Sequence, residues 1–173
     1  SKMLKKSSKI LIIGGSIKGD GIQNLYNNHN NIIEGDVHFG PQTKIIFDAH
    51  DIPFEDESFD CIIIQAVLEH VVDPIRCVNE IYRVLSKNGV VYSETPFMQQ
   101  VHMKAYDFTR FTYLGHRRLF RKFKLIDSGP CCGPGMSLAW SFAYFLKSFT
   151  NNSFLSNIIM KISYIFLFPL KYF

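Results

Sequence analysis

The feature that most constrains the fold is a series of short apolar runs, each ending in small or polar residues. Residues 9–16 read KILIIGGS, and similar runs lie at 32–36, 44–47, 59–67 and 89–94. Continuous apolar runs of this length are typical of strands buried on both faces of a parallel sheet. The sequence therefore predicts strands whose carboxyl ends meet at one edge, where such sheets bind ligands.

A helix is predicted between the last two of these runs. Asp73 suits its N-cap, Pro74 suits its first turn, and Asn88-Gly89 is expected to stop it. Its expected apolar face consists of Ile75, Val78, Ile81, Tyr82 and Leu85. Strands that alternate with helices predict an α/β fold with a Rossmann-like, doubly wound, mostly parallel sheet.

The connection between the second and third runs is expected to be a loop. Only ten residues separate Ile33 from Lys44, and Gly40-Pro41 interrupts them, whereas a crossover helix needs about a dozen residues or more. Further along, Thr112 is a candidate N-cap for a helix over 113–123, and the segment FKLIDSG at 123–129 is a candidate sixth strand.

The C-terminal segment is expected to be apolar and helical. Residues 1–135 are predicted to form the sheet-containing domain, and 136–173 an extension with helices over 136–149 and 154–170. A helix that packs on the domain is the first interpretation. An interfacial helix at a membrane surface is the second, and a full membrane span is the third.

Composition limits the classes of function. With 173 residues of which 47% are hydrophobic, the chain can form one domain with a real core. The net charge is +4, and basic residues gather within 104–124, which suits an anionic partner, although a solvated helix face explains most of them. No metal is expected, because metal-site spacing is absent from the four cysteines, Cys61, Cys77, Cys131 and Cys132. Cys61 and Cys77 suit reduced, buried thiols of a cytoplasmic protein, and the vicinal pair Cys131-Cys132 suits a structural role.

The strand ends carry the candidate binding residues. The glycine loop GGSIKGDG after the first strand allows backbone N–H groups to approach a ligand closely. Asp36, with Glu34 as its rival, can accept hydrogen bonds from ribose hydroxyls at the second strand end. At the third strand end, Asp48 can accept from an exocyclic amino group of a purine, and Ala49 leaves space beside the ring.

A family resemblance covers residues 48–92. The stretch DAHDIPFEDESFDCIIIQAVLEHVVDPIRCVNEIYRVLSKNGVVY resembles the class I S-adenosylmethionine-dependent methyltransferases, in particular the ubiquinone-biosynthesis-like group. The resemblance implies S-adenosylmethionine as cofactor. It further implies that the loop at Gly14, Gly15 and Ser16 holds the methionine part, Asp36 the ribose, Asp48 and Ala49 the adenine, and that Gln65 faces the cofactor and substrate. The sequence departs from the family at Ile12, where an acidic residue is usual.

A narrower resemblance continues through ETPFMQQVHMKAYDFTRFT at 94–112, which is similar to an uncharacterised bacterial subgroup associated with glycan biosynthesis. Methyl transfer needs an in-line nucleophile and sometimes a base. His102 is the candidate base, since histidine is the side chain that most readily takes up and releases a proton near neutral pH. Tyr106, Asp107 and Arg110 are further catalytic candidates; Asp107 and Arg110 alternatively form only a local ion pair.

The expected function is therefore transfer of a methyl group from S-adenosylmethionine to a small-molecule or glycan-precursor acceptor, with oxygen as the favoured acceptor atom. The expected location is cytoplasmic, with peripheral contact at the inner membrane face through the C-terminal helix as an extension of that view. A non-catalytic, methyltransferase-like binding module is the alternative. A nicotinamide-dependent oxidoreductase ranks third, and a nucleic-acid partner is not expected from one basic helix alone.

Overall fold

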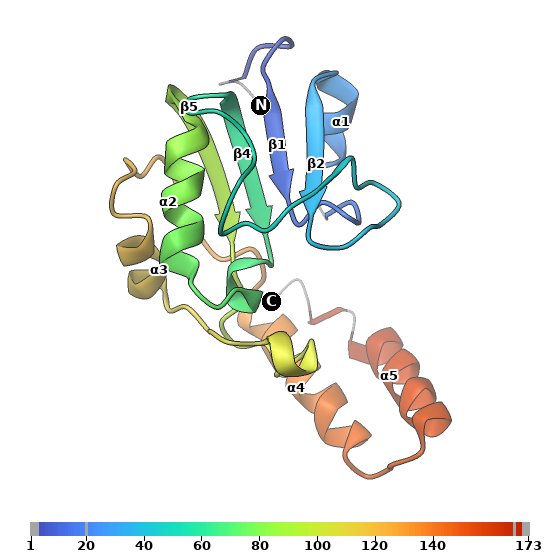
Figure 1. Ribbon diagram of the computed structural model, residues 1–173. Helices are drawn as coiled ribbons and strands as arrows, with labels where there is room; N and C mark the ends of the chain where they lie inside the picture. The colour runs from blue at the N-terminus through green and yellow to red at the C-terminus, as the bar shows by residue number, and fades with distance from the viewer. Residues whose placement is uncertain (1–3, 20, 168, 171–173) are drawn as a thin grey trace. The chain divides into compact units, whose positions relative to one another are not determined.

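The computed structural model describes residues 4–19, 21–167 and 169–170 (Figure 1). The described chain forms two compact units. The first consists of the residues up to Pro96 together with Ala105–Lys124, and the second of Phe97–Lys104 together with the residues from Leu125 onward. The first unit contains the sheet, and the second contains a pair of helices.

The first unit is built on a parallel sheet of five strands in the order β3-β2-β1-β4-β5. Every pair of neighbouring strands runs in the same direction, as Figure 1 shows for the longer strands. This arrangement confirms the predicted doubly wound α/β fold. The strands are β1 (Ile10–Ile13), β2 (Ile32–Asp36), β3 (Ile45–Ile46), β4 (Phe59–Gln65) and β5 (Leu85–Glu94).

The helices of the first unit cover both faces of the sheet. They are α1 (Gln23–Asn28), α2 (Pro74–Val84), α3 (Tyr113–Leu119) and the short 3-10 turn η1 (Leu68–His70). A second 3-10 turn, η2 (Lys104–Tyr106), lies where the chain passes from one unit to the other.

Alternate residues of β1 feed two separate clusters. Leu11 and Ile13 belong to the larger core, which also contains the buried face of α2, whereas Ile10 and Ile12 belong to a smaller core beside α1. Successive side chains of a strand point to opposite faces, so an unbroken apolar run is what a strand covered on both faces requires.

Helix α2 starts as predicted but ends earlier. The Asp73 side chain accepts a hydrogen bond from Arg76 N at 3.0 Å, and Pro74 occupies the first turn. The helix stops at Val84 rather than at Asn88-Gly89, because β5 begins at Leu85, which pairs with Phe59. The predicted apolar face was partly wrong: Ile75 and Tyr82 are exposed, and the buried positions are Cys77, Val78, Ile81 and Val84.

The predicted loop between β2 and β3 is confirmed, and the predicted sixth strand is wrong. No helix lies between Asp36 and Ile45. The predicted helix after Thr112 forms as α3 but ends at Leu119 rather than at 123, and the Thr112 hydroxyl accepts from Gly115 N at 3.1 Å. Beyond it, residues 124–130 form no strand, because Leu125 and Ile126 are exposed and lack a neighbouring strand to pair with among the described residues.

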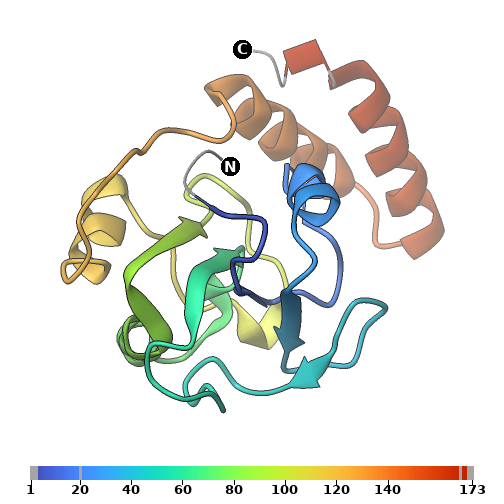
Figure 2. The same ribbon diagram turned by 90° about the horizontal axis from the view of Figure 1, so that it is seen from above.

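The second unit contains α4 (Pro134–Lys147) and α5 (Ser153–Leu167), which lie side by side (Figures 1 and 2). The Asn152 side chain caps α5 by accepting hydrogen bonds from Phe154 N at 2.9 Å and Leu155 N at 3.2 Å. Both predicted C-terminal helices are therefore present. No helix within the described residues has the length and apolar character needed to cross a membrane.

A single arginine fastens the loop before β4 to helix α2. The Arg83 guanidinium donates to the carbonyl oxygens of Ile52 and Phe54, both at 2.8 Å, and to Asp56 at 2.9 Å. It also forms two hydrogen bonds with the carboxylate of Glu80, at 2.7 and 2.9 Å. Glu80 in turn accepts from Ile52 N at 3.0 Å, so the loop is held through both its carbonyl and its amide groups.

We predict that Arg83→Ala lowers the free energy of unfolding by about 2–3 kcal/mol, because it removes the guanidinium donor from two carboxylates and two carbonyl groups. Urea denaturation followed by circular dichroism measures this change. Arg76→Ala on the same helix is the matched control: its side chain is exposed, and its loss should cost no more than about 0.5 kcal/mol. Equal losses of unfolding free energy in Arg83→Ala and Arg76→Ala would contradict the proposed role of Arg83 in holding the loop before β4 to α2.

Candidate functional site at the carboxyl edge of the sheet

The loop after β1 approaches the ends of two neighbouring strands very closely. Gly14 N and Gly15 N donate to the carbonyl oxygen of Gly35 on β2, at 2.9 and 3.1 Å. Gly14 has a φ of 78°, and a Cβ atom there would collide with Val67 Cγ2, just beyond β4. Only glycine meets both conditions. The predicted glycine loop is thus a place where backbone, not side chains, faces the edge of the sheet.

Asp36 organises the backbone of this edge. One oxygen of its carboxylate accepts from Ser16 N at 3.1 Å and the other from His38 N at 3.0 Å. The loop after β1 and the loop after β2 are thereby joined through one carboxylate. Asp36 lies beside Gly15 and Ser16. This position is required if Asp36 and the glycine loop are to bind the same ligand.

Glu34, the rival of Asp36, is placed differently. Its side chain is 3% exposed and forms an ion pair with Lys44 Nζ at 2.8 Å. Burial, together with the Glu34 carboxylate, raises the pKa of Tyr26 to about 12. Glu34 therefore belongs to the interior contact between α1 and the sheet, and the geometry favours Asp36 as the residue at the edge.

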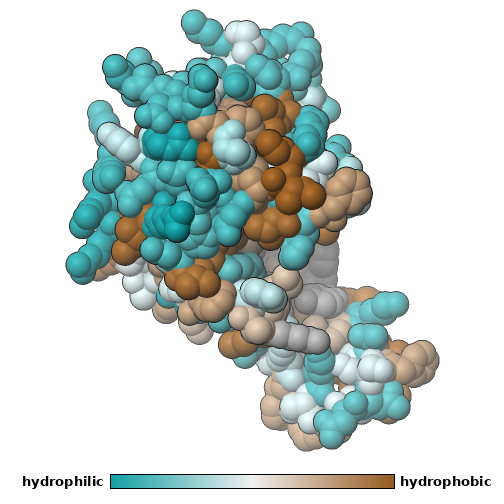
Figure 3. All heavy atoms as spheres, viewed as in Figure 1, coloured by the Kyte–Doolittle hydropathy of each residue, from teal (hydrophilic) through white to brown (hydrophobic). Residues whose placement is uncertain are grey.

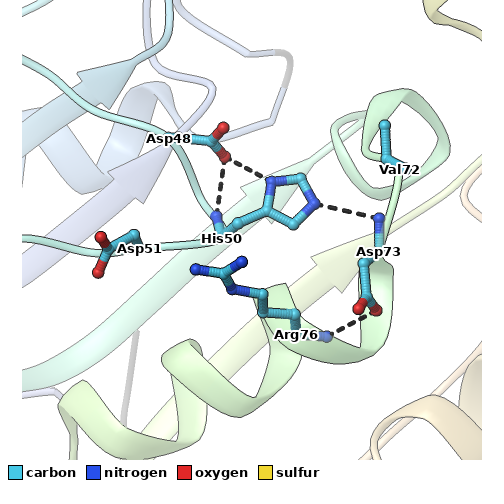
Figure 4. Close-up of a pocket in the computed structure, with 6 residues that line it drawn as sticks. All are labelled: Asp48, His50, Asp51, Val72, Asp73 and Arg76. Carbon is cyan, nitrogen blue, oxygen red and sulfur yellow. Dashed lines mark hydrogen bonds and ion pairs between the residues drawn. The ribbon is translucent and has the colours of Figure 1, made fainter.

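Asp48 follows β3 and is linked to the start of α2 through a histidine (Figure 4). Asp48 Oδ1 accepts from His50 N at 2.9 Å and lies 2.6 Å from His50 Nδ1, while His50 Nε2 accepts from Asp73 N at 3.1 Å. These bonds require the proton on Nδ1 of the neutral ring. The hydrogen bonds from His50 hold the pKa of Asp48 below its ordinary value.

A cavity of about 510 Å³ lies between Asp48 and the start of α2 (Figure 4). The predicted partner of Asp48, Ala49, is 5% exposed and packs in the larger core, so its methyl group is not on the surface of the site. The cavity is lined by Asp48, His50, Asp51, Val72, Asp73 and Arg76.

Gln65 is the last residue of β4, and its surroundings are polar. Gln65 Nε2 donates to Glu94 Oε2 at 3.0 Å, and the Tyr92 hydroxyl donates to the same oxygen at 2.9 Å. The next residue, Ala66, has a φ of 50°, in the left-handed region that residues other than glycine rarely adopt. Backbone strain of this kind is common at ligand-binding sites, and Ala66 lies where β4 delivers its end to the glycine loop.

The predicted catalytic residues fall in different parts of the structure. Asp107 and Arg110 form a bidentate ion pair, in which Arg110 Nη2 lies 2.7 Å from Asp107 Oδ2 and Nη1 donates to Oδ1. The Asp107 side chain is 1% exposed. Tyr106 has an exposed side chain. His102 belongs to the second unit. The local ion pair is therefore present, and the catalytic roles of all four residues remain predictions.

The segment around this ion pair folds against η1. Phe108 N and Thr109 N both donate to the carbonyl oxygen of Glu69, at 2.8 and 3.2 Å. His70 Nδ1 lies 2.6 Å from the carbonyl oxygen of Tyr106. A carbonyl oxygen only accepts, so Nδ1 carries a proton and the lone pair of the neutral ring lies on Nε2.

Glu69 is the residue whose position the sequence did not predict. Its side chain is fully buried, and neither carboxylate oxygen has a hydrogen-bond partner among the described residues; His70 Nε2 lies 3.7 Å from Oε1. Burial raises the pKa of Glu69 above its ordinary value. A buried, unsatisfied carboxyl group beside a ligand-binding edge is a functional candidate. The pair Glu69-His70 after β4 was the only sequence signal for it.

Comparisons with known proteins give similarities to methyltransferases. A family model described as a methyltransferase domain matches residues 25–93, from α1 into β5. No curated protein matches the chain by sequence. Among solved structures, an S-adenosylmethionine-dependent methyltransferase from Mesorhizobium loti is similar with a TM-score of 0.54 and 14% identity, over 70% of this chain and 76% of that one.

Two further structures give the same result. A Thermotoga maritima methyltransferase, a possible histamine N-methyltransferase, has a TM-score of 0.50 and 20% identity, over 70% of this chain and 65% of that one. A chain from the complex of the Haloferax volcanii Trm112 methyltransferase activator with a candidate methyltransferase has a TM-score of 0.53 and 20% identity, over 69% of this chain. The present chain spans 62% of that chain and less than half of several others.

The sheet order and the strand-end site define the fold of the class I S-adenosylmethionine-dependent methyltransferases. The match of the methyltransferase-domain model over residues 25–93 confirms the resemblance seen in the sequence. S-adenosylmethionine is the cofactor that this family implies.

We predict that Glu69→Gln makes the fold more stable, and increasingly so as the pH rises. The folded state holds the Glu69 proton more tightly than the unfolded chain does, so wild-type stability falls once the pH passes the ordinary glutamate value of about 4.3. Glutamine keeps the shape without this loss. The gain should reach the order of 1 kcal/mol at pH 8, measured by urea denaturation at a series of pH values from 4.5 upward.

Glu55→Gln is the control for this measurement, because Glu55 is exposed to water and its replacement should give no pH-dependent gain. If the gain in unfolding free energy of Glu69→Gln stays constant across the pH series, folding is not linked to protonation of Glu69, and the prediction is contradicted.

Proposed function

We propose that this protein is an active methyltransferase that moves a methyl group from S-adenosylmethionine to a small-molecule or glycan-precursor acceptor. The observation that carries the proposal is the convergence of the glycine loop, Asp36 and the end of β4 at one edge of the sheet, within a chain that contains a methyltransferase domain. Oxygen is the proposed acceptor atom.

The residues of the edge fit this cofactor. The loop at Gly14, Gly15 and Ser16 would lie against its methionine part, and the glycine at position 14 keeps this loop close to the ends of β2 and β4, since a Cβ atom there would collide with Val67. The Asp36 carboxylate would accept from the ribose hydroxyls. Asp48 Oδ2, which takes no part in the contacts with His50, would accept from the adenine amino group, and Gln65 would face the reacting end.

The chain would contribute mainly positioning to the reaction. S-adenosylmethionine supplies a methyl group already activated by its sulfonium charge. The protein must hold an acceptor oxygen in line and take its proton. His102 is the base proposed from the sequence. His70 is a second candidate, because Nδ1 donates to the Tyr106 carbonyl oxygen, which places the proton-accepting lone pair of the neutral ring on Nε2.

A non-catalytic binding module is the second candidate function. Where the family usually has an acidic residue, Ile12 is buried in the smaller core, and both oxygens of Asp36 already accept backbone N–H groups. A domain of this kind would keep the sheet and serve as a partner for another molecule. It would bind cofactor weakly and transfer no methyl group.

We predict that the protein binds S-adenosylhomocysteine and that Asp36→Asn weakens the binding at least about tenfold, since a charged acceptor is lost. Isothermal titration calorimetry measures both affinities. Asp60→Asn is the matched control: the Asp60 carboxylate also accepts a backbone N–H, from Lys9 at 2.8 Å, but it stands at the start of β4, at the opposite edge of the sheet. Its replacement should leave the affinity unchanged.

Absence of binding at millimolar S-adenosylhomocysteine, with the fold intact by circular dichroism, would exclude the enzyme. Binding without transfer of a labelled methyl group to any of a panel of hydroxylated sugars and nucleotide sugars would favour the binding module. Transfer that is lost in His102→Gln but kept in His70→Gln would assign the base to His102, and the reverse pattern to His70.

A further inference from the structure

The α4–α5 hairpin, residues 134–167, has an unusual charge composition. The last acidic residue of the whole sequence is Asp127, and the only charged side chains after it are those of Lys147, Lys161 and Lys171. Globular helices in water normally carry both signs of charge on their outer faces. A segment this long with lysine alone matches a negatively charged surface.

The hairpin buries small residues between its helices and exposes large apolar ones, which is the opposite of the packing of helix pairs in water. Among the residues of the two helices whose burial is described, the buried positions are occupied by small residues, namely Gly135, Ala139, Ala143, Ser156 and Ser163. Large apolar side chains lie on the outside, with exposures from 56% at Phe145 to 77% at Phe166. Others of this outer set are Leu138, Phe149, Phe154 and Ile165.

This arrangement is characteristic of helices packed in lipid. In water, a pair of helices is held together by burying its large apolar side chains between the helices. In a bilayer that driving force is missing, and helices pack through small residues, as at positions 135, 139 and 143, which are four apart. The large side chains are then left to contact the acyl chains.

We propose that the α4–α5 hairpin binds to the surface of a bilayer that contains anionic phospholipid, with its outer apolar side chains in the interface and its lysines at the headgroups. Figure 3 shows apolar side chains, in tan and brown, on the visible face of the hairpin beside hydrophilic ones. Lysines and aromatic residues at the edge of an apolar surface are typical of interfacial helices. The proposal does not depend on the methyltransferase activity.

A second copy of the chain is the competing occupant of this surface. Pairing of two hairpins would cover the same apolar side chains, but each hairpin offers Lys147 and Lys161 and no acidic residue to receive them. Like charges would meet across such an interface. Anionic lipid covers the apolar face and neutralises the lysines at the same time, so the charges favour lipid.

The only tryptophan of the chain makes the proposal directly testable. Trp140 lies in α4, so its fluorescence reports on the hairpin alone. The full chain is mixed with vesicles of phosphatidylcholine and with vesicles that also contain 30 mol% phosphatidylglycerol, a proportion of roughly one third that gives an anionic surface. We expect a blue shift of Trp140 emission, quenching by brominated acyl chains, and stronger partition into the anionic vesicles.

Matched variants separate the contribution of the apolar side chains from that of the lysines. The double variant Phe149→Gln and Phe166→Gln should lower partition at least about tenfold. Phe39→Gln is the control, because Phe39 is equally exposed, at 83%, but lies in the loop after β2. Lys147→Glu should lower partition into anionic vesicles by about fivefold or more and leave that into neutral vesicles unchanged, whereas Lys6→Glu, an exposed lysine near the start of the chain, should have a smaller effect.

Three results would overturn the proposal. One is unchanged Trp140 emission at a large excess of anionic lipid, with the fold intact by circular dichroism. Another is equal loss of partition in the hairpin variants and their controls. The third is concentration-dependent dimerisation, seen by analytical ultracentrifugation, that Phe149→Gln with Phe166→Gln abolishes in the absence of lipid binding.

Discussion

The close approach of the loop after β1 to the ends of β2 and β4 is the constraint on which the site depends. Gly14 can lie beside Val67 only because it lacks a side chain and can adopt a positive φ. The same approach allows Asp36 to accept from Ser16 N. Because parallel strands end at one edge, three short segments distant in sequence form one surface, and that surface consists of backbone amides and carboxylates rather than bulky side chains.

The polar interactions around this edge divide into those that build it and those that are left for chemistry. Arg83 and Glu80 are fully occupied in fixing the loop that follows Asp48, and His50 links Asp48 to the start of α2. Glu69 has no such partner among the described residues although it is completely buried. The buried Glu69 carboxyl group is therefore a candidate functional group beside this edge.

Much of the fold follows from patterns within short segments. The apolar runs predict the strands, Asp73-Pro74 predicts the start of α2, and the ten residues between Ile33 and Lys44 exclude a crossover helix. The errors arose where a neighbouring segment decides the outcome. Helix α2 stops at Val84 because Leu85 pairs with β4, and residues 123–129 form no strand although their local pattern suits one. The burial of Glu69 likewise depends on a segment forty residues away, which no local pattern reveals.

The loop that replaces the helix between β2 and β3 has a consequence for the border of the sheet. Strand β3 is the outermost strand on that side, and it contains only two residues. A long outer strand would offer a row of unpaired backbone groups to other chains, and natural sheets avoid this hazard by shortening such strands. Here the outer strand β3 is too short to act as a template for another strand. The sheet is therefore protected at β3 from the addition of strands from other chains.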